Sequence, residues 1–205
     1  MAAILAKKLG MTQRFLDDGR VERVTVLEAG PCPVTAIRSK ERDGYEAVQL
    51  AFGPCKEKVL TKAQLGHLKK ADAPAHRHLA EFRDEVGELL MGETVTVDVF
   101  EPGQRVKVSG KSKGKGFQGT IKRHNFASGP KSHGSHNVRA PGSIGASATP
   151  SRVFKGIRGP GQMGNRQVTQ KGLEIVGVDQ KENLLLVRGS VPGPSGGVVE
   201  VRSDA

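Results

Sequence analysis

Residues 102–173 read PGQRVKVSGKSKGKGFQGTIKRHNFASGPKSHGSHNVRAPGSIGASATPSRVFKGIRGPGQMGNRQVTQKGL, and they separate two kinds of sequence in this chain. The segment contains fourteen Lys and Arg, three His and fourteen of the 27 Gly, but no Asp or Glu. All other residues together hold 18 basic and 21 acidic side chains, so the net charge of +11 arises within this segment. Its apolar side chains are too sparse to form a core that would offset the entropy lost on ordering. We therefore expect a basic extension that is largely disordered on its own.

The charge of this segment predicts a polyanionic partner. Fourteen uncompensated cations repel one another and need negative charge to draw them together. Glycine lets peptide N–H groups approach phosphates, and Ser, Asn and His can bond to phosphate and 2′-hydroxyl oxygens. We expect RNA. The alternatives are a DNA-binding architectural protein, which would bind duplex DNA equally well, an RNA-modifying enzyme, and a solvated loop without a partner.

Three short motifs within the segment resemble signatures of enzymes or nucleotide-binding proteins, but their contexts do not fit. Residues 114–119 match GxGxxG, yet no amphipathic helix follows and no acidic residue lies about twenty positions on to hold a ribose. Residues 110–112 look like the end of a Walker A loop, but Arg105 occupies the position of its first glycine. The SHGSH run at 132–136 has no nearby carboxylate to orient a histidine. We expect no catalytic residues, no cofactor and no small-molecule substrate.

The rest of the sequence predicts a mainly β domain. Its core must be modest, because hydrophobic residues make up 36% of the chain and aromatic residues 4%. Asp-Asp-Gly at 17–19 and Asp-Gly at 43–44 are hairpin signals, and Gly-Pro-Cys-Pro at 30–33 marks a change of strand direction. Short strands supplied by both ends of the chain favour a small closed antiparallel β-barrel. The predicted strands are residues 3–15, 21–28, 34–38, 45–52, 94–100, 105–109, 173–178, 184–189 and 198–202.

A short helical insert is expected at about residues 60–89. Residues 61–71 begin with a capping Thr, and residues 75–85 favour a second helical turn or two. The insert contains His67, His76 and His78, but acidic partners at metal-ligand spacing are missing, so we expect no metal site.

Two further features bear on the cellular location. Cys32 and Cys55 lack CxxC spacing, and we expect both to be reduced. No apolar run approaches the 18 residues of a membrane-spanning helix, and the N-terminus lacks the features of a secretion signal. We therefore expect no membrane contact and a cytoplasmic protein.

Ordered sequence blocks throughout the chain resemble the universal L-three family of large-subunit ribosomal proteins, in its bacterial form. The blocks are KLGMTQ (8–13), AGPCPV (29–34), DGYEAVQL (43–50), GKSKGKGFQGTIKRHNF (110–126), SHGSH (132–136), PGSIG (141–145), TPSRVFKG (149–156), GQMGN (161–165) and ENLLLVRGSVPG (182–193).

The resemblance implies a barrel of the kind found in translation factors, with a long, irregular basic finger that reaches toward the peptidyl transferase centre. It implies a structural role in the ribosome, binding to 23S ribosomal RNA near its 3′ end, and an early part in assembly of the large subunit. It also implies contacts with the neighbouring large-subunit proteins fourteen and nineteen. Many bacterial relatives carry a glutamine just before TPxxVFKG, N-methylated in some, whereas this chain has Ala148, so that modification is not expected here.

These inferences assign residues 1–124 and 166–205 to a barrel body and residues 125–165 to an RNA-binding finger. Its expected tip comprises Gly145, Ala146, Ser147, Ala148 and Thr149. Aromatic residues of the segment are expected to stack on bases or to pack at the base of the finger, namely Phe117, Phe126 and Phe154. The predicted RNA-binding residues are Lys111, Lys113, Lys115, Lys122, Arg123, His124, Lys131, His133, His136, Arg139, Arg152, Lys155, Arg158 and Arg166.

Overall fold

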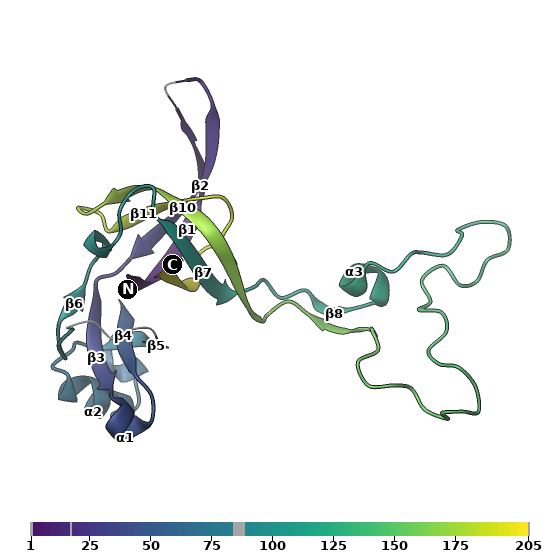
Figure 1. The fold of residues 1–205 in the computed structure, drawn as a ribbon, viewed down its shortest axis with the longest axis horizontal. Helices are drawn as coiled ribbons and strands as arrows, with labels where there is room; N and C mark the ends of the chain where they lie inside the picture. Colours follow the sequence, from purple (N-terminus) through teal and green to yellow (C-terminus); the bar gives the residue numbers. More distant parts are fainter. Residues whose placement is uncertain (1, 17, 84–88, 205) are drawn as a thin grey trace. The chain divides into compact units, whose positions relative to one another are not determined.

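The structure is a computed structural model that describes residues 2–16, 18–83 and 89–204. It divides into two compact units (Figure 1). The body unit comprises Met1–Ser112 and Gln167–Ala205, and the basic unit comprises Lys113–Arg166. In sequence, the basic unit is an insertion within the body unit.

The body unit contains the predicted closed antiparallel barrel (Figure 1). Its strands follow one another around the barrel in the order β1-β12-β7-β10-β11-β2. Near the chain ends β1 pairs with β12, with Ala3 opposite Arg202, so both termini contribute to closure as predicted. The barrel strands are β1 (Ala3–Phe15), β2 (Val21–Ala29), β7 (Arg105–Lys111), β10 (Gln167–Asp179), β11 (Leu184–Arg188) and β12 (Val198–Ser203).

Alternate residues of the barrel strands fill its interior. In β7, Val106 and Val108 are fully buried, whereas Lys107 between them is partly exposed. In β11, Leu185 and Val187 are buried in the same way. This two-residue period is typical of a strand with one buried face, and it is the pattern from which the strands were predicted.

A second sheet lies beside the barrel in the same unit, with strand order β5-β4-β3-β6. Its strands are β3 (Cys32–Arg38), β4 (Ala47–Pro54), β5 (His76–Phe82) and β6 (Thr94–Val95). Between them lie α1 (Lys40–Asp43), η1 (Glu57–Val59) and α2 (Lys62–Lys70), and η2 (Val97–Val99) follows β6. The strands predicted at 34–38 and 45–52 therefore belong to this sheet and not to the barrel wall. The change of direction predicted at 30–33 is confirmed, since β2 ends at Ala29 and β3 begins at Cys32.

Two local predictions were wrong. Residues 76–82 form strand β5 and not a helix, because they pair along β4 from Val48 opposite Phe82 to Pro54 opposite His76, and this pairing overrides the local helix propensity. Residues 84–88 of the predicted insert, which include the last two residues of that predicted helix, lie outside the described residues. Asp17 of the first predicted turn also lies outside them. The strand predicted at 94–100 stops after Val95, because Val95 pairs with Cys32, the first residue of β3, and residues Val97–Val99 form η2 instead.

The predicted helix at 61–71 is confirmed as α2. Thr61 caps it, because its side chain accepts a hydrogen bond from the Gln64 backbone while the Gln64 side chain bonds back to the Thr61 N–H. A turn was predicted at residues 43–44, between β3 and β4. The structure has the short helix α1 in this connection, and Gly44 caps its end in the left-handed conformation (φ 81°). No helix among the described residues is both long and apolar enough to span a membrane.

One hydrophobic cluster joins the barrel to the second sheet. It includes Ile4 and Val108 from the barrel and Val34, Leu50 and Phe82 from the sheet. Cys32 lies in this cluster, where burial raises the pKa of its thiol to about 12. The two sheets of the body unit therefore share a core, and Cys32 acts as a small apolar side chain within it.

A buried lysine ties β1 to the loop that precedes β12. Lys8 is only 8% exposed, and its Nζ donates to the carbonyl oxygens of Val191 at 2.7 Å and Gly193 at 3.3 Å. The backbone of Lys8 bonds to the same loop, donating to Gly197 O at 2.9 Å and accepting from Gly196 N–H at 2.6 Å. The loop is thus fixed against the barrel by a charged group bound to neutral acceptors.

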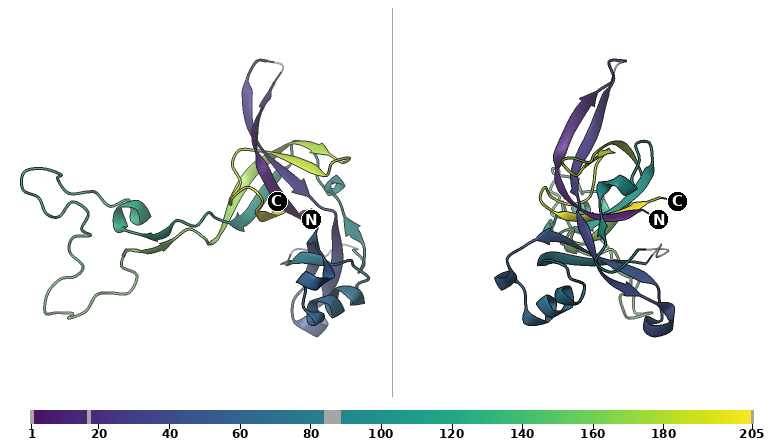
Figure 2. Two further views of the ribbon diagram at one scale, coloured as in Figure 1. Left: turned by 180° about the vertical axis from the view of Figure 1, so that it is seen from behind. Right: turned by 90° about the vertical axis from the view of Figure 1, so that its left-hand side faces the viewer.

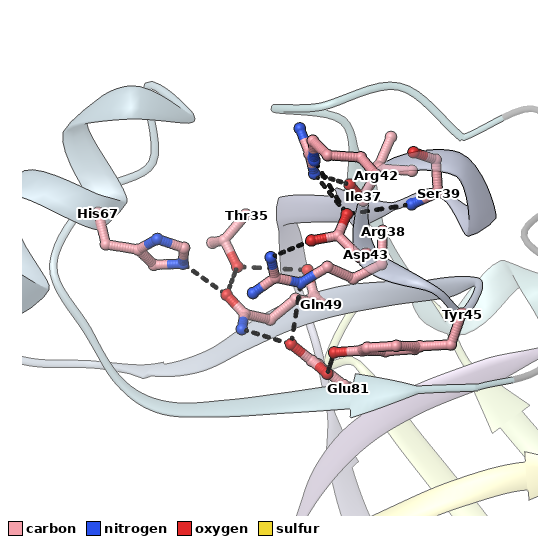
Figure 3. Close-up of polar contacts among 10 residues, drawn as sticks. All are labelled: Thr35, Ile37, Arg38, Ser39, Arg42, Asp43, Tyr45, Gln49, His67 and Glu81. Atoms are coloured by element: carbon pink, nitrogen blue, oxygen red, sulfur yellow. Dashed lines mark hydrogen bonds and ion pairs between the residues drawn. The ribbon is translucent and has the colours of Figure 1, made fainter.

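A polar network joins α1 and α2 to the second sheet (Figure 3). Glu81 on β5 accepts hydrogen bonds from Tyr45 Oη at 2.9 Å, Arg38 Nε at 3.4 Å and Gln49 Nε2 at 3.3 Å. Because the Gln49 amide nitrogen faces this carboxylate, its oxygen faces His67 Nε2 at 2.6 Å. His67 therefore donates from Nε2 and attaches α2 to β4.

Asp43 forms the other end of this network. Its carboxylate accepts from Arg42 Nε at 3.0 Å, Arg38 Nη1 at 3.0 Å and the Ser39 N–H at 3.3 Å. The hydrogen bond from Arg42, with those from Ser39 and Arg38, lowers the pKa of Asp43 below its ordinary value. The carboxylate form is thus favoured in the folded chain.

Substituting Lys8 tests the buried contact. We expect Lys8→Met to lower the free energy of unfolding by about 2–3 kcal/mol, because buried carbonyls lose a charged donor. The matched control is Lys7→Met, since Lys7 is an exposed residue that meets Glu28 at 3.8 Å, and surface pairs contribute about 0–1 kcal/mol. Urea denaturation of both variants measures the difference, and equal losses would contradict a special role for Lys8.

Asp43 predicts a specific dependence of stability on pH. A carboxylate whose pKa is lowered by folding stabilises the protein above its unfolded pKa, and this contribution disappears as pH falls through the folded pKa. We therefore expect Asp43→Asn to be less stable than wild type at pH 7, with the difference shrinking toward pH 3. Urea midpoints at both pH values measure this, with the exposed Glu57→Gln as control. A difference that does not change with pH would refute the argument.

Candidate nucleic-acid interface

The basic unit carries ten Lys and Arg and no Asp or Glu, so it contains no carboxylate to neutralise its cations. Its regular structure, in a unit described throughout, is limited to strands β8 (Gly116–Gln118) and β9 (Gly161–Met163) and the helix α3 (Thr120–His124). These elements form what we call the neck, residues 113–126 and 159–166. The remaining residues, 127–158, have an irregular backbone.

The neck is held by backbone contacts at close range. β8 and β9 pair antiparallel, with Gly116 opposite Met163, and Lys115 N–H donates to Met163 O at 2.9 Å. Next to this pair Gly164 has a φ of +70°, and a Cβ built there would lie 2.1 Å from Lys113 O. The position therefore requires glycine, both for its conformation and for the approach of the opposite strand.

The helix α3 binds the returning segment through two predicted RNA-binding residues. Arg123 Nη1 donates to Gly159 O at 2.7 Å, and His124 Nε2 lies 3.1 Å from the same oxygen. Since a carbonyl only accepts, His124 carries its proton on Nε2. Both side chains are half-buried, so the structure places them in contacts within the neck. The prediction that they bind RNA remains a prediction.

The irregular part contains a closed loop that presents three of the predicted residues. Gly129 N–H donates to Val138 O at 3.0 Å, and a Cβ at Gly129 would lie 2.5 Å from Asn137 O. The loop exposes Lys131, His133 and His136. Beside it lies an open hollow of about 570 Å³, lined by Ala127, Ser128, Gly129, Asn137, Ala140, Pro141 and Gly142.

The expected tip forms a compact turn of small residues. Ser143 Oγ donates a hydrogen bond to Gly145 O at 2.9 Å, and Ser151 Oγ donates one to Ala148 O. Ser147 and Pro150 form an isolated β-bridge. All five residues predicted for the tip, Gly145 to Thr149, are exposed. Ser143 to Ser147 and Ser151 to Val153 line a second open hollow of about 410 Å³. Uncharged residues form most of this lining, and Arg152 is its one charged side chain.

The other predicted cations are distributed over the basic unit and point outward. Lys111 is exposed at the end of β7 in the body unit. The exposed cations of the basic unit are Lys113, Lys115, Lys122, Lys131, Arg139, Arg152, Lys155, Arg158 and Arg166. These side chains are accessible to a polyanion, and their binding to RNA remains a prediction.

The aromatic residues of the segment differ in exposure. Phe117 is 75% exposed and Phe154 is 61% exposed, whereas Phe126 is half-buried with its ring 6.2 Å from that of His124. The Arg152 guanidinium lies over the Phe154 ring, 5.6 Å from its centroid. Phe117 and Phe154 are therefore the ones available for base stacking, while Phe126 packs in the neck.

Comparison with known proteins gives this surface its family context. The family model described as Ribosomal protein L3 matches residues 53–183, more than half of the chain. The chain belongs to the ribosomal protein L3 family. It is 53% identical over 204 residues to the large ribosomal subunit protein uL3 of Acidothermus cellulolyticus, covering 98% of this chain and 92% of that protein. It is 50% identical to the proteins of the same name from Thermosynechococcus vestitus (97% and 94% covered) and Synechococcus sp. (97% and 93% covered).

The ribosomal protein L3 family consists of structural, non-enzymatic components, which confirms the prediction that the chain is not an enzyme. Two of the three histidines of the body unit form hydrogen bonds within it. His67 bonds to Gln49, and His76 Nδ1 lies 2.8 Å from Pro74 O. Burial and the nearby Arg77 lower the pKa of His78.

Gly164 gives a test of the neck. We expect Gly164→Ala to separate β8 from β9, because the new Cβ would overlap Lys113 O and the left-handed φ disfavours alanine. Amide hydrogen exchange at Lys115 should then accelerate at least tenfold. The matched control is Gly159→Ala, because a Cβ at Gly159 has no neighbour within 4 Å among the described residues. Unchanged exchange in Gly164→Ala would show that the pairing does not depend on this close approach.

Proposed function

We propose that this chain is a structural component of the large ribosomal subunit that binds 23S ribosomal RNA through the basic unit and Lys111. The observation that carries the proposal is the surface of residues 113–166, where exposed cations with no carboxylate among them lie on a narrow, irregular backbone. Phosphate contacts would supply the missing negative charge, and the exposed Phe117 and Phe154 would stack on unpaired bases. The family of the chain and the names of its relatives support this reading.

The finer part of the proposal rests on the family resemblance. We propose that the chain binds near the 3′ end of 23S ribosomal RNA and acts early in subunit assembly in the cytoplasm. Residues 125–165 form the finger that extends toward the peptidyl transferase centre, with residues 145–149 at its tip. Large-subunit proteins fourteen and nineteen are its proposed neighbours.

Sedimentation of a cell lysate tests the main proposal. The chain should travel with the large subunit and remain there after a moderate salt wash. Recovery of the whole pool in the soluble fraction would overturn the proposal. Competition between a 23S ribosomal RNA fragment and duplex DNA separates the proposal from the architectural alternative, which expects equal affinities.

Binding to isolated 23S ribosomal RNA should depend steeply on salt. If about half to two-thirds of the fourteen cations of residues 102–173 meet phosphates, the slope of log K against log salt is about −5 to −8. We expect Lys113→Gln with Lys115→Gln to make this slope shallower by about one to two. Lys56→Gln with Lys58→Gln, a pair of exposed lysines in the body unit, should leave it unchanged. A wild-type slope shallower than about −2 would contradict the electrostatic account.

Ribosome activity should be sensitive to added side-chain volume at the tip and not to the loss of a polar side chain there. In the free chain a Cβ at Gly145 would lie 4.0 Å from Arg152 O, so a side chain can start there without a backbone clash. We expect ribosomes with Gly145→Arg or Ala148→Trp to assemble but to show altered peptide-bond formation or drug inhibition, because a crowded RNA environment cannot accommodate the new volume. Ser147→Ala should be nearly silent. Normal values for both bulky variants on purified ribosomes would place the tip elsewhere.

A further inference from the structure

The distal half of the β1–β2 hairpin extends beyond the barrel as a two-stranded ribbon (Figures 1 and 2). β1 pairs with β2 as far as Phe15 opposite Val21. The next strands around the barrel stop earlier, since β12 pairs with β1 only along 3–7 and β11 pairs with β2 only along 24–28. Residues 11–15 and 21–23 thus form a ribbon that the barrel wall does not flank.

One face of this ribbon turns back to the body unit. Directly opposite residues of an antiparallel pair share a face, so Thr12 and Val24 lie on the same side as Arg14 and Glu22. Arg14 Nη1 donates to Val176 O at 3.2 Å, Glu22 meets Arg188 Nε at 3.5 Å, and Val24 is 1% exposed. The charged side chains of this face, Arg14 and Glu22, therefore have partners in the barrel.

The other face carries the apolar side chains and is open to solvent. Met11, Phe15 and Val21 are 52%, 68% and 51% exposed, and Arg23, opposite Gln13, lies between them in the register. We call these five residues the hairpin face. A solvated ribbon would normally place its apolar residues on the covered side, as it does with Val24, but Met11, Phe15 and Val21 lie on the solvent side. The exposed Phe15 lies directly opposite the exposed Val21, and Met11 lies on the same face beyond the Gln13–Arg23 pair. Apolar side chains gathered on one exposed face are a feature of interaction surfaces.

The charges of the ribbon favour a protein over RNA as its partner. Residues 11–23 contain three basic and three acidic side chains, so the ribbon has no net charge, in contrast to the basic unit. Arg20 is paired with Asp18 at 2.5 Å, and Arg14 is bound to the barrel. Arg23 is then the charged residue of the hairpin face. Its single positive charge can pair with one carboxylate but is too small to bind a phosphate backbone.

A second copy of this chain fits the hairpin face less well. Two such faces would bring an Arg23 from each copy into the same apolar contact. Five side chains also cover less than the roughly 800 Å² per partner of a stable interface, so the contact would need support from further binding in an assembly. A neighbour held in place by the same large subunit meets this requirement.

We propose that the hairpin face docks on a neighbouring large-subunit protein, at an apolar patch that carries a carboxylate opposite Arg23. The inference rests on the proposed ribosomal role of the chain. Met11, Phe15 and Val21 would be buried in the contact, with the Phe15 ring as its anchor. Arg23 would pair with the carboxylate and fix the orientation of the ribbon.

Photo-crosslinking on purified large subunits tests this inference. Benzoylphenylalanine is placed at Phe15 or at Val21 in the full chain, and the matched control places it at Thr12 on the opposite face of the same ribbon. We expect both hairpin-face positions to crosslink to the same large-subunit protein, within a peptide that contains apolar residues and an Asp or Glu. The Thr12 position should not give this product. Crosslinks to RNA, to a second copy of this chain or to no molecule would each overturn the inference.

Two variants complete the test. Phe15→Ser with Val21→Ser should lower retention of the chain on salt-washed subunits at least fivefold, while its thermal midpoint and its affinity for isolated 23S ribosomal RNA stay unchanged. Arg23→Glu should weaken retention, and a Lys in place of the partner's carboxylate should restore it. If wild type itself is absent from large subunits, the proposed function fails and this inference fails with it. If wild type is present and the variants are retained normally, the inference alone is wrong.

Discussion

The lack of any carboxylate between Glu101 and Glu174 is the constraint on which the rest of this molecule depends. Cations in this segment cannot be neutralised by local ion pairs, so whatever order the basic unit has must come from neutral acceptors and close backbone packing. The carbonyl of Gly159, which accepts from Arg123 and His124, provides such an acceptor. The narrow approach of Gly164 to Lys113 O provides the packing. Both contacts lie in the neck, and the cations of residues 127–158 are exposed.

The body unit solves the complementary problem of holding both ends of this insertion. Lys111 at the end of β7 lies opposite Gln167 at the start of β10, so the chain leaves and re-enters the body unit at paired positions of one ladder. The closed barrel fixes that ladder, because β7 is also paired with β12 and β10 with β11. The nearly neutral body unit, with its continuous core, therefore stabilises the fold. The sequence of the basic unit is then free to serve binding.

The sequence predicted most of the barrel because its strands repeat every two residues and are bounded by turn signals. The failure at 76–82 has a clear cause: HRHLAEF contains good helix formers, while the strand depends on pairing with β4, more than twenty residues away. The cations of the candidate interface were predicted from charge alone. Charge could not show that Arg123 and His124 meet Gly159, since that contact joins residues 36 and 35 positions apart. The hairpin face was missed because a ribbon beyond the barrel has the same alternation as a strand within it.

The position of the neck also affects how the finger can bind. Fixing one residue costs about 1–2 kcal/mol of backbone entropy, so ordering a long basic segment on RNA would consume much of the electrostatic attraction. Contacts within the neck order residues 113–126 and 159–166 without RNA, so in the proposed complex this cost would fall mainly on residues 127–158. Inside that range the bond from Gly129 to Val138 and the turn around Ser147 and Pro150 restrict the chain further. If the basic unit binds RNA as proposed, its neutral hydrogen bonds would raise the RNA affinity without touching RNA, because they reduce the entropy that binding must remove.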